Sequence, residues 1–327
     1  MNIQNISELK KELSKFNYPL DDNAIFIGTG SEQVVVLKNN RIIHFIGFGY
    51  SKLDYSDMIL SIKEMQKYFD RLKRAGVKTS CPDLENVQLY EKPFPLMIIE
   101  DNYEGKPVKE YMDKNDADYL IIFKKIFLET LKAVKNNAPM DSSPKNYVIN
   151  EKEEVIYVDF FIPYTESWLF NKNKNEEYIL FTLLNFFIPN CELSIFVSKA
   201  IIEKPHMKNQ ILNIVYDNID GKILQEIKNK FESKEYEFLL TNHKTLMVKH
   251  KEEISNEEIF RKIGYYDKTH KLIIKKDEVF SSSHSIMELY KKMEDNYIAR
   301  PYNCLLWNKE DIETAIRIMN ELKLKNM

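Results

Sequence analysis

Hydrophobic positions in the first hundred residues follow a helical spacing in some stretches and a strand-like spacing in others. Apolar side chains recur at helical spacing over 7–16 and over 56–75, which predicts two amphipathic helices. Asn5 or Ser7 can cap the first helix, and Gly76 ends the second. Short β-branched and aromatic runs predict strands at 24–27, 34–37, 41–45, 87–90 and 96–99.

Helical spacing dominates the rest of the chain, after a polar, exposed connector at 100–105 that marks a candidate domain boundary. Two short strands at 146–149 and 155–158 form a predicted hairpin, and further strands are expected at 246–250 and 272–275. The predicted helices cover residues 109–112, 116–135, 176–187, 193–203, 208–218, 221–231, 256–263, 286–293 and 309–324.

Composition places the chain among globular proteins. Of its 327 residues, 44% are hydrophobic and 12% aromatic, enough for a sizeable core and about two domains. Lys and Arg total 47 against 50 Asp and Glu, for a net charge of -3. This balance gives no overall attraction to nucleic acid or to an anionic membrane.

Cysteines and apolar runs bear on the expected location. Cys81, Cys191 and Cys304 are far apart and have no partner at ligand spacing, so neither a disulfide framework nor a zinc site is predicted. The most apolar run, 178–189, is too short to cross a bilayer, and no secretion signal is recognised at the start of the chain. We therefore expect a cytoplasmic protein.

A glycine-containing turn separates the first two predicted strands. It reads Gly28-Thr29-Gly30-Ser31, and glycines at such a turn let backbone N–H groups approach phosphate oxygens that a Cβ would obstruct. Many hairpin turns contain glycine without binding a ligand, so this turn alone is a weak indication. A strand follows it and no Gly-Lys-Ser/Thr is present, which excludes a dinucleotide fingerprint and a Walker loop.

Three polar residues with the spacing of a phosphoryl-transfer site lie around the predicted hairpin. Asp141 precedes Asn146 in the loop before the hairpin, and Asp159 follows its second strand. Phosphoryl transfer needs a carboxylate near the acceptor hydroxyl and oxygen ligands for Mg²⁺, and these residues can supply both. The alternative interpretation is structural: Asp141 caps a turn, Asn146 opens a strand and Asp159 ends one.

The order of these features resembles that of the protein-kinase-like superfamily over about residues 20–190. The loop Asp141-Ser142-Ser143-Pro144-Lys145-Asn146 is more similar to that of aminoglycoside phosphotransferases and related small-molecule kinases than to that of protein kinases. The resemblance implies an α+β, bilobal protein-kinase-like fold. Its small antiparallel-sheet N-lobe would cover 1–100, and its large, mainly helical C-lobe would cover 101–327.

The resemblance also implies an activity, that of an ATP- and Mg²⁺-dependent phosphotransferase acting on a small-molecule hydroxyl. Asp141 would be the catalytic carboxylate, and Asn146 and Asp159 would hold the metal ion. No peptide-kinase activation segment is recognisable after Asp159, which favours a small molecule over a peptide. The expected partners are a nucleotide and a small-molecule acceptor, without nucleic acid or membrane.

Nucleotide contacts follow from the same resemblance. Gly28, Gly30 and Ser31 would cover the phosphates of ATP. Glu100 and Asp101 would lie in the linker between the lobes, where backbone groups meet the adenine edge.

The chain departs from the kinase pattern at the residue that orients the phosphates. His44 occupies the position of the usual lysine, and Glu64 would be its ion-pairing partner on the predicted helix 56–75. A histidine beside Glu64 and phosphate could act if protonated, because such neighbours favour the charged form. The departure supports an alternative, a pseudokinase-like nucleotide-binding or scaffold protein. A nucleotidyl transferase on the same fold is a further alternative.

Overall fold

A computed structural model shows that the chain divides into two compact units. The described residues are 3–30, 32–39, 41–49, 53–102, 105–170, 179, 182–233, 236, 264–266, 272–274 and 309–326. Unit 1 comprises Met1–Glu129 and Ser143–Asn171, and unit 2 comprises Thr130–Ser142 and Lys172–Met327. Each unit is therefore built from two separate stretches of the chain, and the division predicted at residue 100 stays a prediction.

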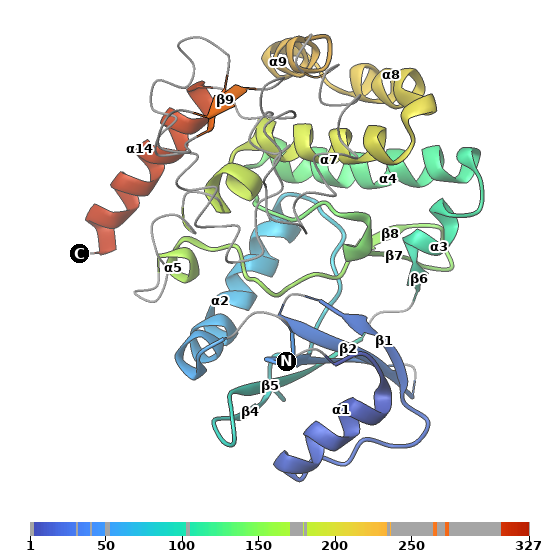
Figure 1. The fold of residues 1–327 in the computed structure, drawn as a ribbon, viewed down its shortest axis with the longest axis vertical. Coiled ribbons are helices and arrows are strands. Elements are labelled where there is room, and N and C mark those ends of the chain that lie inside the picture. The colour runs from blue at the N-terminus through green and yellow to red at the C-terminus, as the bar shows by residue number, and fades with distance from the viewer. Residues whose placement is uncertain are drawn as a thin grey trace. The chain divides into compact units, whose positions relative to one another are not determined.

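A five-stranded antiparallel sheet forms the first part of unit 1 (Figure 1). Its strand order is β1-β2-β3-β5-β4, so three consecutive strands form a meander and β5 lies between β3 and β4. The strands are β1 (Ile25–Thr29), β2 (Gln33–Lys38), β3 (Arg41–Ile46), β4 (Gln88–Tyr90) and β5 (Leu96–Asp101). All five strands that the sequence predicts in this region are confirmed.

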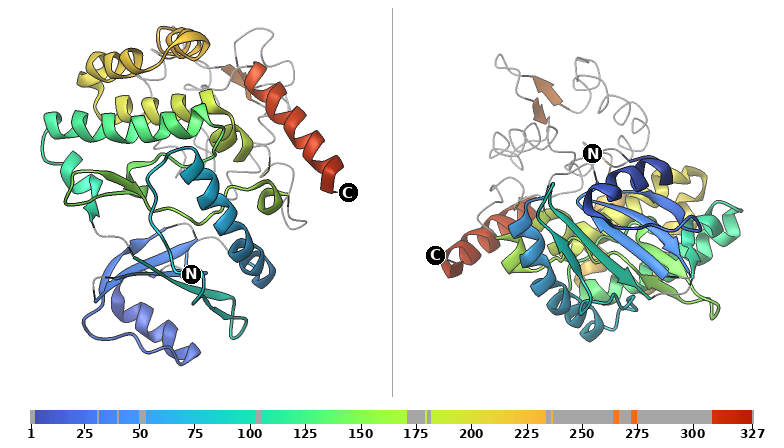
Figure 2. Two further views of the ribbon diagram at one scale, coloured as in Figure 1. Left: turned by 180° about the vertical axis from the view of Figure 1, so that it is seen from behind. Right: turned by 90° about the horizontal axis from the view of Figure 1, so that it is seen from below.

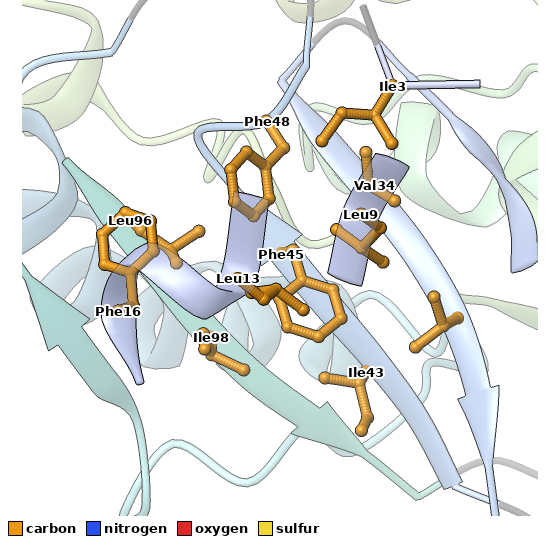
Figure 3. Close-up of a cluster of buried hydrophobic side chains, with 11 residues drawn as sticks. Ile3, Leu9, Leu13, Phe16, Val34, Ile43, Phe45, Phe48, Leu96 and Ile98 are labelled. Carbon is orange, nitrogen blue, oxygen red and sulfur yellow. The ribbon is translucent and has the colours of Figure 1, made fainter. Parts of the chain in front are cut away.

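Helix α1 (Ile6–Leu13) and the 3-10 turn η1 (Ser14–Phe16) cover one face of this sheet, as Figure 2 shows. Asn5 caps α1 because its side chain accepts a 3.0 Å hydrogen bond from Glu8 N. The buried cluster between the helix and the sheet, drawn in Figure 3, contains Ile3, Leu9, Leu13, Phe16, Val34, Val36, Ile43, Phe45, Phe48, Leu96 and Ile98.

Helix α2 (Tyr55–Arg74) packs against the other face of the sheet, and Gly76, with a φ of 79°, follows its end. Because successive strand residues point to opposite faces, Ile46 of β3 and Ile99 of β5 face this helix. The second buried cluster contains Ile46, Met58, Met65, Phe69, Met97, Ile99, Phe160 and Phe161. The last two come from the segment after Asp159, which is thereby part of the core of unit 1.

The rest of unit 1 contains a second antiparallel sheet and short helices. Its strands, in the order β6-β7-β8, are β6 (Lys106–Pro107), β7 (Tyr147–Ile149) and β8 (Val155–Tyr157). The helical elements around it are α3 (Val108–Met112), α4 (Asp116–Lys135), the 3-10 turn η2 (Pro144–Asn146) and α5 (Glu166–Leu169). The predicted hairpin is confirmed as β7 and β8, and α4 continues from unit 1 into unit 2.

Helices dominate the described part of unit 2. The elements are the π-helical η3 (Leu183–Phe187), α7 (Pro189–Glu203), the 3-10 turn η4 (Pro205–Met207), α8 (Lys208–Asn218), α9 (Gly221–Phe231), β9 (Gly264–Tyr266), β10 (Leu272–Ile274) and α14 (Lys309–Asn326). Helix α7 contacts η3, α8 and α9, and α14 contacts η3. The elements predicted at 246–250, 256–263 and 286–293 lie outside the described residues.

Strands concentrated in the first part of the chain and helices in the second confirm the predicted α+β class. The prediction of an exposed connector at 100–105 is wrong for its first two residues, because Glu100 and Asp101 end β5. Asp101 is fully buried despite its charge. Among the helices of the described ranges, none is both long and apolar enough to cross a membrane.

Candidate functional site

The β7–β8 hairpin brings two of the predicted site residues to one end. Tyr147 pairs with Tyr157, so Asn146 and Val158 are adjacent just beyond the paired strands. The Val158 N–H donates a 2.9 Å hydrogen bond to the Asn146 carbonyl, which extends the pairing by one step at the end opposite the turn. Asp159 follows directly. Asn146 is buried, and Asp159 is half-buried with its Oδ1 atom shielded from solvent.

The side chains of Asn146 and Asp159 offer an amide oxygen and a carboxylate, which are donor types that suit Mg²⁺. This ion usually takes its remaining ligands from water and from substrate phosphates, so two protein side chains fit it. In the described ranges, no group of three or more His, Cys, Asp or Glu residues is arranged to hold a metal ion. A metal ion held by Asn146 and Asp159 would have to take its remaining ligands from water or from a bound phosphate.

Phe160, the residue after Asp159, connects this segment to the five-stranded sheet. Its ring centroid lies 4.5 Å from that of His44 on β3 in an edge-on contact. It also lies 6.1 Å from the ring of Phe69 on α2. Position 44, where the kinase pattern has its phosphate-orienting lysine, is therefore close to the segment that carries Asp159.

The His44 ring is buried and neutral. Nδ1 lies 2.9 Å from the Gln33 side-chain oxygen, and since an amide oxygen only accepts, Nδ1 carries the ring proton. Nε2, left with its lone pair, is 3.9 Å from Asp101 Oδ2, too far for a hydrogen bond. Burial lowers the pKa of His44 from 6.5 to about 3. A protonated His44 was expected only beside both Glu64 and phosphate, so for the nucleotide-bound protein it stays a prediction.

Asp101 is on the same face of the sheet as His44 and is fully buried. Burial raises the pKa of its carboxyl group to about 6, although the Ser80 hydroxyl and the N–H groups of Cys81 and Asn102 lie nearby and favour ionisation. None of these neighbours has the geometry of a hydrogen bond, so within the described part of the chain both carboxylate oxygens are buried and unbonded. Near neutral pH, this anion and the His44 lone pair face each other.

Glu100 accepts hydrogen bonds at both its side chain and its backbone. Its Oε2 atom accepts a 2.9 Å hydrogen bond from Nη1 of Arg41, in an exposed ion pair. Its carbonyl oxygen accepts a 2.8 Å hydrogen bond from Asp83 N. The adenine contact predicted for Glu100 would have to share this carbonyl with Asp83.

Glu64 is buried on α2, but its partners differ from the predicted one. Thr165 Oγ1 donates a 2.6 Å hydrogen bond to Glu64 Oε2, and Lys67 Nζ donates one of 2.6 Å to Oε1. His44 bonds to Gln33 instead. The predicted Glu64–His44 ion pair is therefore wrong here: the carboxylate is satisfied by a hydroxyl and by a lysine one turn along the helix.

The fold around Gly28 and Gly30 has room for a Cβ at each position. A Cβ at Gly28 would meet no atom within 4 Å, and one at Gly30 would make only an ordinary contact at 3.7 Å with Gln33 O. Gly47 is different, because its φ is +111° and a Cβ there would lie 2.5 Å from Pro95 O. Ser31, the last residue of the turn, lies outside the described residues.

Asp141, the predicted catalytic carboxylate, belongs to unit 2. The next residue, Ser142, donates a 2.9 Å hydrogen bond from its backbone N–H to Glu192 Oε1. Glu192 is in the first turn of α7 and is buried. Burial, and after it the charge of Asp141, raises the pKa of Glu192 to about 8.

The sequence did not predict the partners of three candidate site regions. Gln33 contacts His44, Thr165 donates to Glu64, and Glu192 accepts from the residue after Asp141. Gln33 opens a strand beside the glycine turn, and no local signal marks it as a partner of His44. Thr165 had a weak signal, since a threonine before a short apolar stretch can cap a helix. Glu192 reads as an ordinary acidic residue in a first helical turn after Pro189.

The chain was also compared with known proteins. No family model matches it, and no curated protein is similar to it in sequence.

Proposed function

We propose that this protein is a kinase-like phosphotransferase that moves the γ-phosphoryl group of ATP to the hydroxyl of a small molecule. Asn146 and Asp159 would hold Mg²⁺ against the nucleotide phosphates. Asp141 would orient the acceptor hydroxyl. The proposal includes the bilobal protein-kinase-like fold that the order of elements implies.

The end of the β7–β8 hairpin opposite its turn carries this proposal. Asn146 is bonded there to Val158, the residue before Asp159, which brings a buried amide and a half-buried carboxylate to one end of the hairpin. Phe160 then packs on the His44 ring. The segment after Asp159 thus leads from these two oxygen donors to the sheet that carries the glycine turn.

The glycine turn is a second feature that bears on the proposal. Neither Gly28 nor Gly30 has a positive φ or a crowded Cβ position, although Gly28 follows a register shift in β1 and the Gly30 N–H already donates a 2.8 Å hydrogen bond to Gln33 O. Small residues at these positions would let phosphate oxygens approach the backbone of the turn.

Catalysis would come mainly from positioning and charge neutralisation. When bound, Mg²⁺ neutralises charge on the phosphate oxygens. Asp141 accepts the hydrogen bond of the acceptor hydroxyl and takes its proton as the oxygen attacks. The new bond forms between this oxygen and the γ-phosphorus while the bond to the ADP oxygen breaks. The products are ADP and a phosphorylated alcohol, and Asp141 returns the proton to solvent.

Replacing Asp159 by Ala tests this proposal. ATP that binds only the folded state raises its stability by RT ln(1 + [L]/Kd), about 2.7 kcal/mol when ATP is 100-fold above Kd. We expect ATP with Mg²⁺ to raise the unfolding temperature of the wild type, and Asp159→Ala to lose this rise while it still folds. The measurement is thermal unfolding with ATP, with and without Mg²⁺.

Asp113→Ala is the matched control, because Asp113 is an exposed carboxylate at the end of α3 in the same unit. It should keep the full rise in unfolding temperature. The proposal fails if Asp159→Ala shows the wild-type response to Mg²⁺ and ATP. With an acceptor found by screening hydroxyl compounds, release of ADP identifies phosphoryl transfer, whereas release of pyrophosphate identifies nucleotidyl transfer.

The environment of His44 favours a second candidate, a pseudokinase-like scaffold. A phosphate oxygen at position 44 needs a donor, but it would meet the lone pair of Nε2 and the nearby Asp101 carboxylate. If ATP produces no shift in either protein, with or without Mg²⁺, this second candidate is supported and the phosphotransferase is not.

A further inference from the structure

A register shift in β1, between Phe26 and Gly28, precedes the glycine turn. Phe26 and Thr29 are three positions apart, so in a regular strand their side chains would face opposite sides of the sheet. Both instead face the buried cluster beneath α1: Phe26 packs against that cluster, and Thr29 lies opposite Val34, one of its members. The shift therefore directs the Thr29 side chain toward α1.

The same shift leaves a glycine on the other face of the sheet. Gly28 lies opposite Val35, and Val35 lies opposite His44 of β3, so these three positions share the face away from α1. A Cβ at Gly28 would meet no atom within 4 Å, so the backbone is open on this side. Phosphate oxygens that approach the turn from this side would meet no side chain at position 28.

The N-terminal segment of the chain fixes Thr29 on the α1 side. The Thr29 hydroxyl donates a hydrogen bond to the Ile3 carbonyl oxygen. Ile3 is only 2% exposed and belongs to the cluster drawn in Figure 3. The next residue, Gln4, donates a 2.8 Å hydrogen bond from its N–H to Glu8 Oε2 on α1. One hydroxyl therefore ties the glycine turn to a segment that is packed on the sheet.

We propose that Thr29 is a positioning residue for the nucleotide phosphates: its hydrogen bond to Ile3 holds the backbone of the glycine turn in the shape that receives them. The inference rests on the proposed function, in which Gly28 and Gly30 cover these phosphates. The Thr29 side chain lies on the face away from the ligand, so it acts through the backbone, with the N-terminal segment as its support.

Loss of this tie should weaken ATP binding. Without it the turn samples other shapes in the free protein, and the apparent Kd rises by the factor by which the competent fraction falls. The net contribution of one neutral hydrogen bond corresponds to about 3- to 10-fold in an equilibrium constant. We therefore expect a change of this size in the Kd of ATP.

The test is the Kd of ATP in the presence of Mg²⁺, measured by titration calorimetry. Thr29→Val keeps the shape of the side chain but has no hydroxyl, so it should bind ATP about 3- to 10-fold more weakly than the wild type. Thr29→Ser keeps the hydroxyl and should bind ATP like the wild type.

Thr79→Val is the matched control, because it makes the same substitution in the same unit at a buried hydroxyl with no hydrogen-bond partner among the described residues. It should keep the wild-type Kd. An unchanged Kd in Thr29→Val overturns the proposal even if this variant is less stable, because a merely structural tie would lower stability without changing affinity. Equal losses of affinity in Thr29→Val and Thr29→Ser also overturn it.

Amide hydrogen exchange separates failure of this inference from failure of the proposed function. In the protein without nucleotide, Thr29→Val should speed exchange at the Gly30 N–H, which donates a 2.8 Å hydrogen bond to Gln33 O. If the wild type binds ATP and Thr29→Val exchanges as slowly as the wild type, only the inference is overturned. If exchange is faster but the wild type does not bind ATP with Mg²⁺, the proposed function and the role in phosphate binding are overturned, while the tie itself is confirmed.

Discussion

His44 lies opposite Ile99 in the sheet, with its ring between Gln33 and Phe160. The buried imidazole has lost its proton and does not supply the positive charge that a protonated lysine brings to phosphate. Each pKa unit corresponds to about 1.4 kcal/mol, so protonating His44 at neutral pH costs on the order of 5 kcal/mol. If nucleotide binds here, its phosphates have to be held mainly by backbone N–H groups and by the metal ion.

The glycine turn gives a prediction at the scale of single residues. Gly28→Ala should leave the free energy of unfolding unchanged or raise it by up to about 1 kcal/mol, because a Cβ has open space there and alanine restricts the unfolded chain. The same variant should weaken ATP binding, since the Cβ would obstruct the phosphates. Urea unfolding and the ATP-induced shift in unfolding temperature measure the two effects.

Gly47→Ala is the control for this comparison. Its positive φ and the 2.5 Å approach to Pro95 O mean that alanine should destabilise the fold by about 1 to 3 kcal/mol. If Gly28→Ala binds ATP as tightly as the wild type, the turn has no role in phosphate binding.

The sequence predicted which site residues lie near each other only where those residues are close together along the chain. Asn146 and Asp159 are joined by one hairpin, so strand pairing brings them to the same end. Glu64 and its partner Thr165 are 101 positions apart, and nothing in the spacing of either residue predicts the other. The state of His44 depends on burial by Phe160, which is equally remote in the sequence.

At the scale of elements, Thr165 joins α2 to α5. Its hydroxyl donates to Glu64 on α2 and accepts a 3.4 Å hydrogen bond from Trp168 N, which caps α5. Arg71 of α2 makes a second link, with 3.1 Å between its Nη1 and Glu166 Oε1. The helix beside the sheet and the segment after Asp159 are therefore held together by polar contacts as well as by the phenylalanine core.

Thr165→Val should lower the free energy of unfolding by about 1 to 3 kcal/mol. The substitution keeps the shape of the side chain but leaves the buried Glu64 without one of its donors and α5 without its cap. Urea unfolding should show a lower midpoint with an unchanged slope.

Thr165→Ser, which retains the hydroxyl, is the control and should stay much closer to the wild type. Equal midpoints for Thr165→Val and the wild type would show that the Thr165 hydroxyl does not stabilise the fold.

Most elements could be predicted because periodicity and caps are local properties. The helices predicted at 208–218 and 221–231 are α8 and α9, and the strands of the meander differ from prediction only at their ends. Helix α5 was missed because four residues are too few to show a period, and β9 because it is only three residues long. The end of β5 was missed because charged residues usually mark exposed chain, whereas Asp101 is buried.

At the scale of the whole molecule, the perturbed carboxyl and imidazole groups set the dependence of stability on pH. Glu192 holds its proton up to about pH 8 when folded but only to about 4.5 when unfolded, so it lowers stability as pH rises through that range. Asp101 acts in the same direction between about 3.8 and 6. His44 acts oppositely between about 3 and 6.5, because there the unfolded chain binds its proton.

Between pH 6.5 and 8 Glu192 is the main one of these three groups to titrate, because only the tail of the titration of His44 in the unfolded chain falls in this interval. The free energy of unfolding of the wild type should therefore fall by about 1 to 2 kcal/mol across it. Glu192→Gln should remove that slope.

Urea unfolding at several pH values in this interval measures the effect. Glu203→Gln makes the same substitution at the exposed last residue of α7, and this control should keep the slope. A wild-type stability that rises from pH 6.5 to 8 would contradict a protonated Glu192.

The interleaving of the two units has a consequence for synthesis on the ribosome. The sheet and α2 are complete once Asp101 has emerged, but Phe160 and Phe161, which fill the core between them, are translated later. Phe160 follows Asp101 by 59 residues, so at about 5 to 20 residues per second the gap is about 3 to 12 seconds. During that interval the nascent chain presents Met58, Met65 and Phe69 without their final partners, and this apolar surface is a ready binding site for a chaperone.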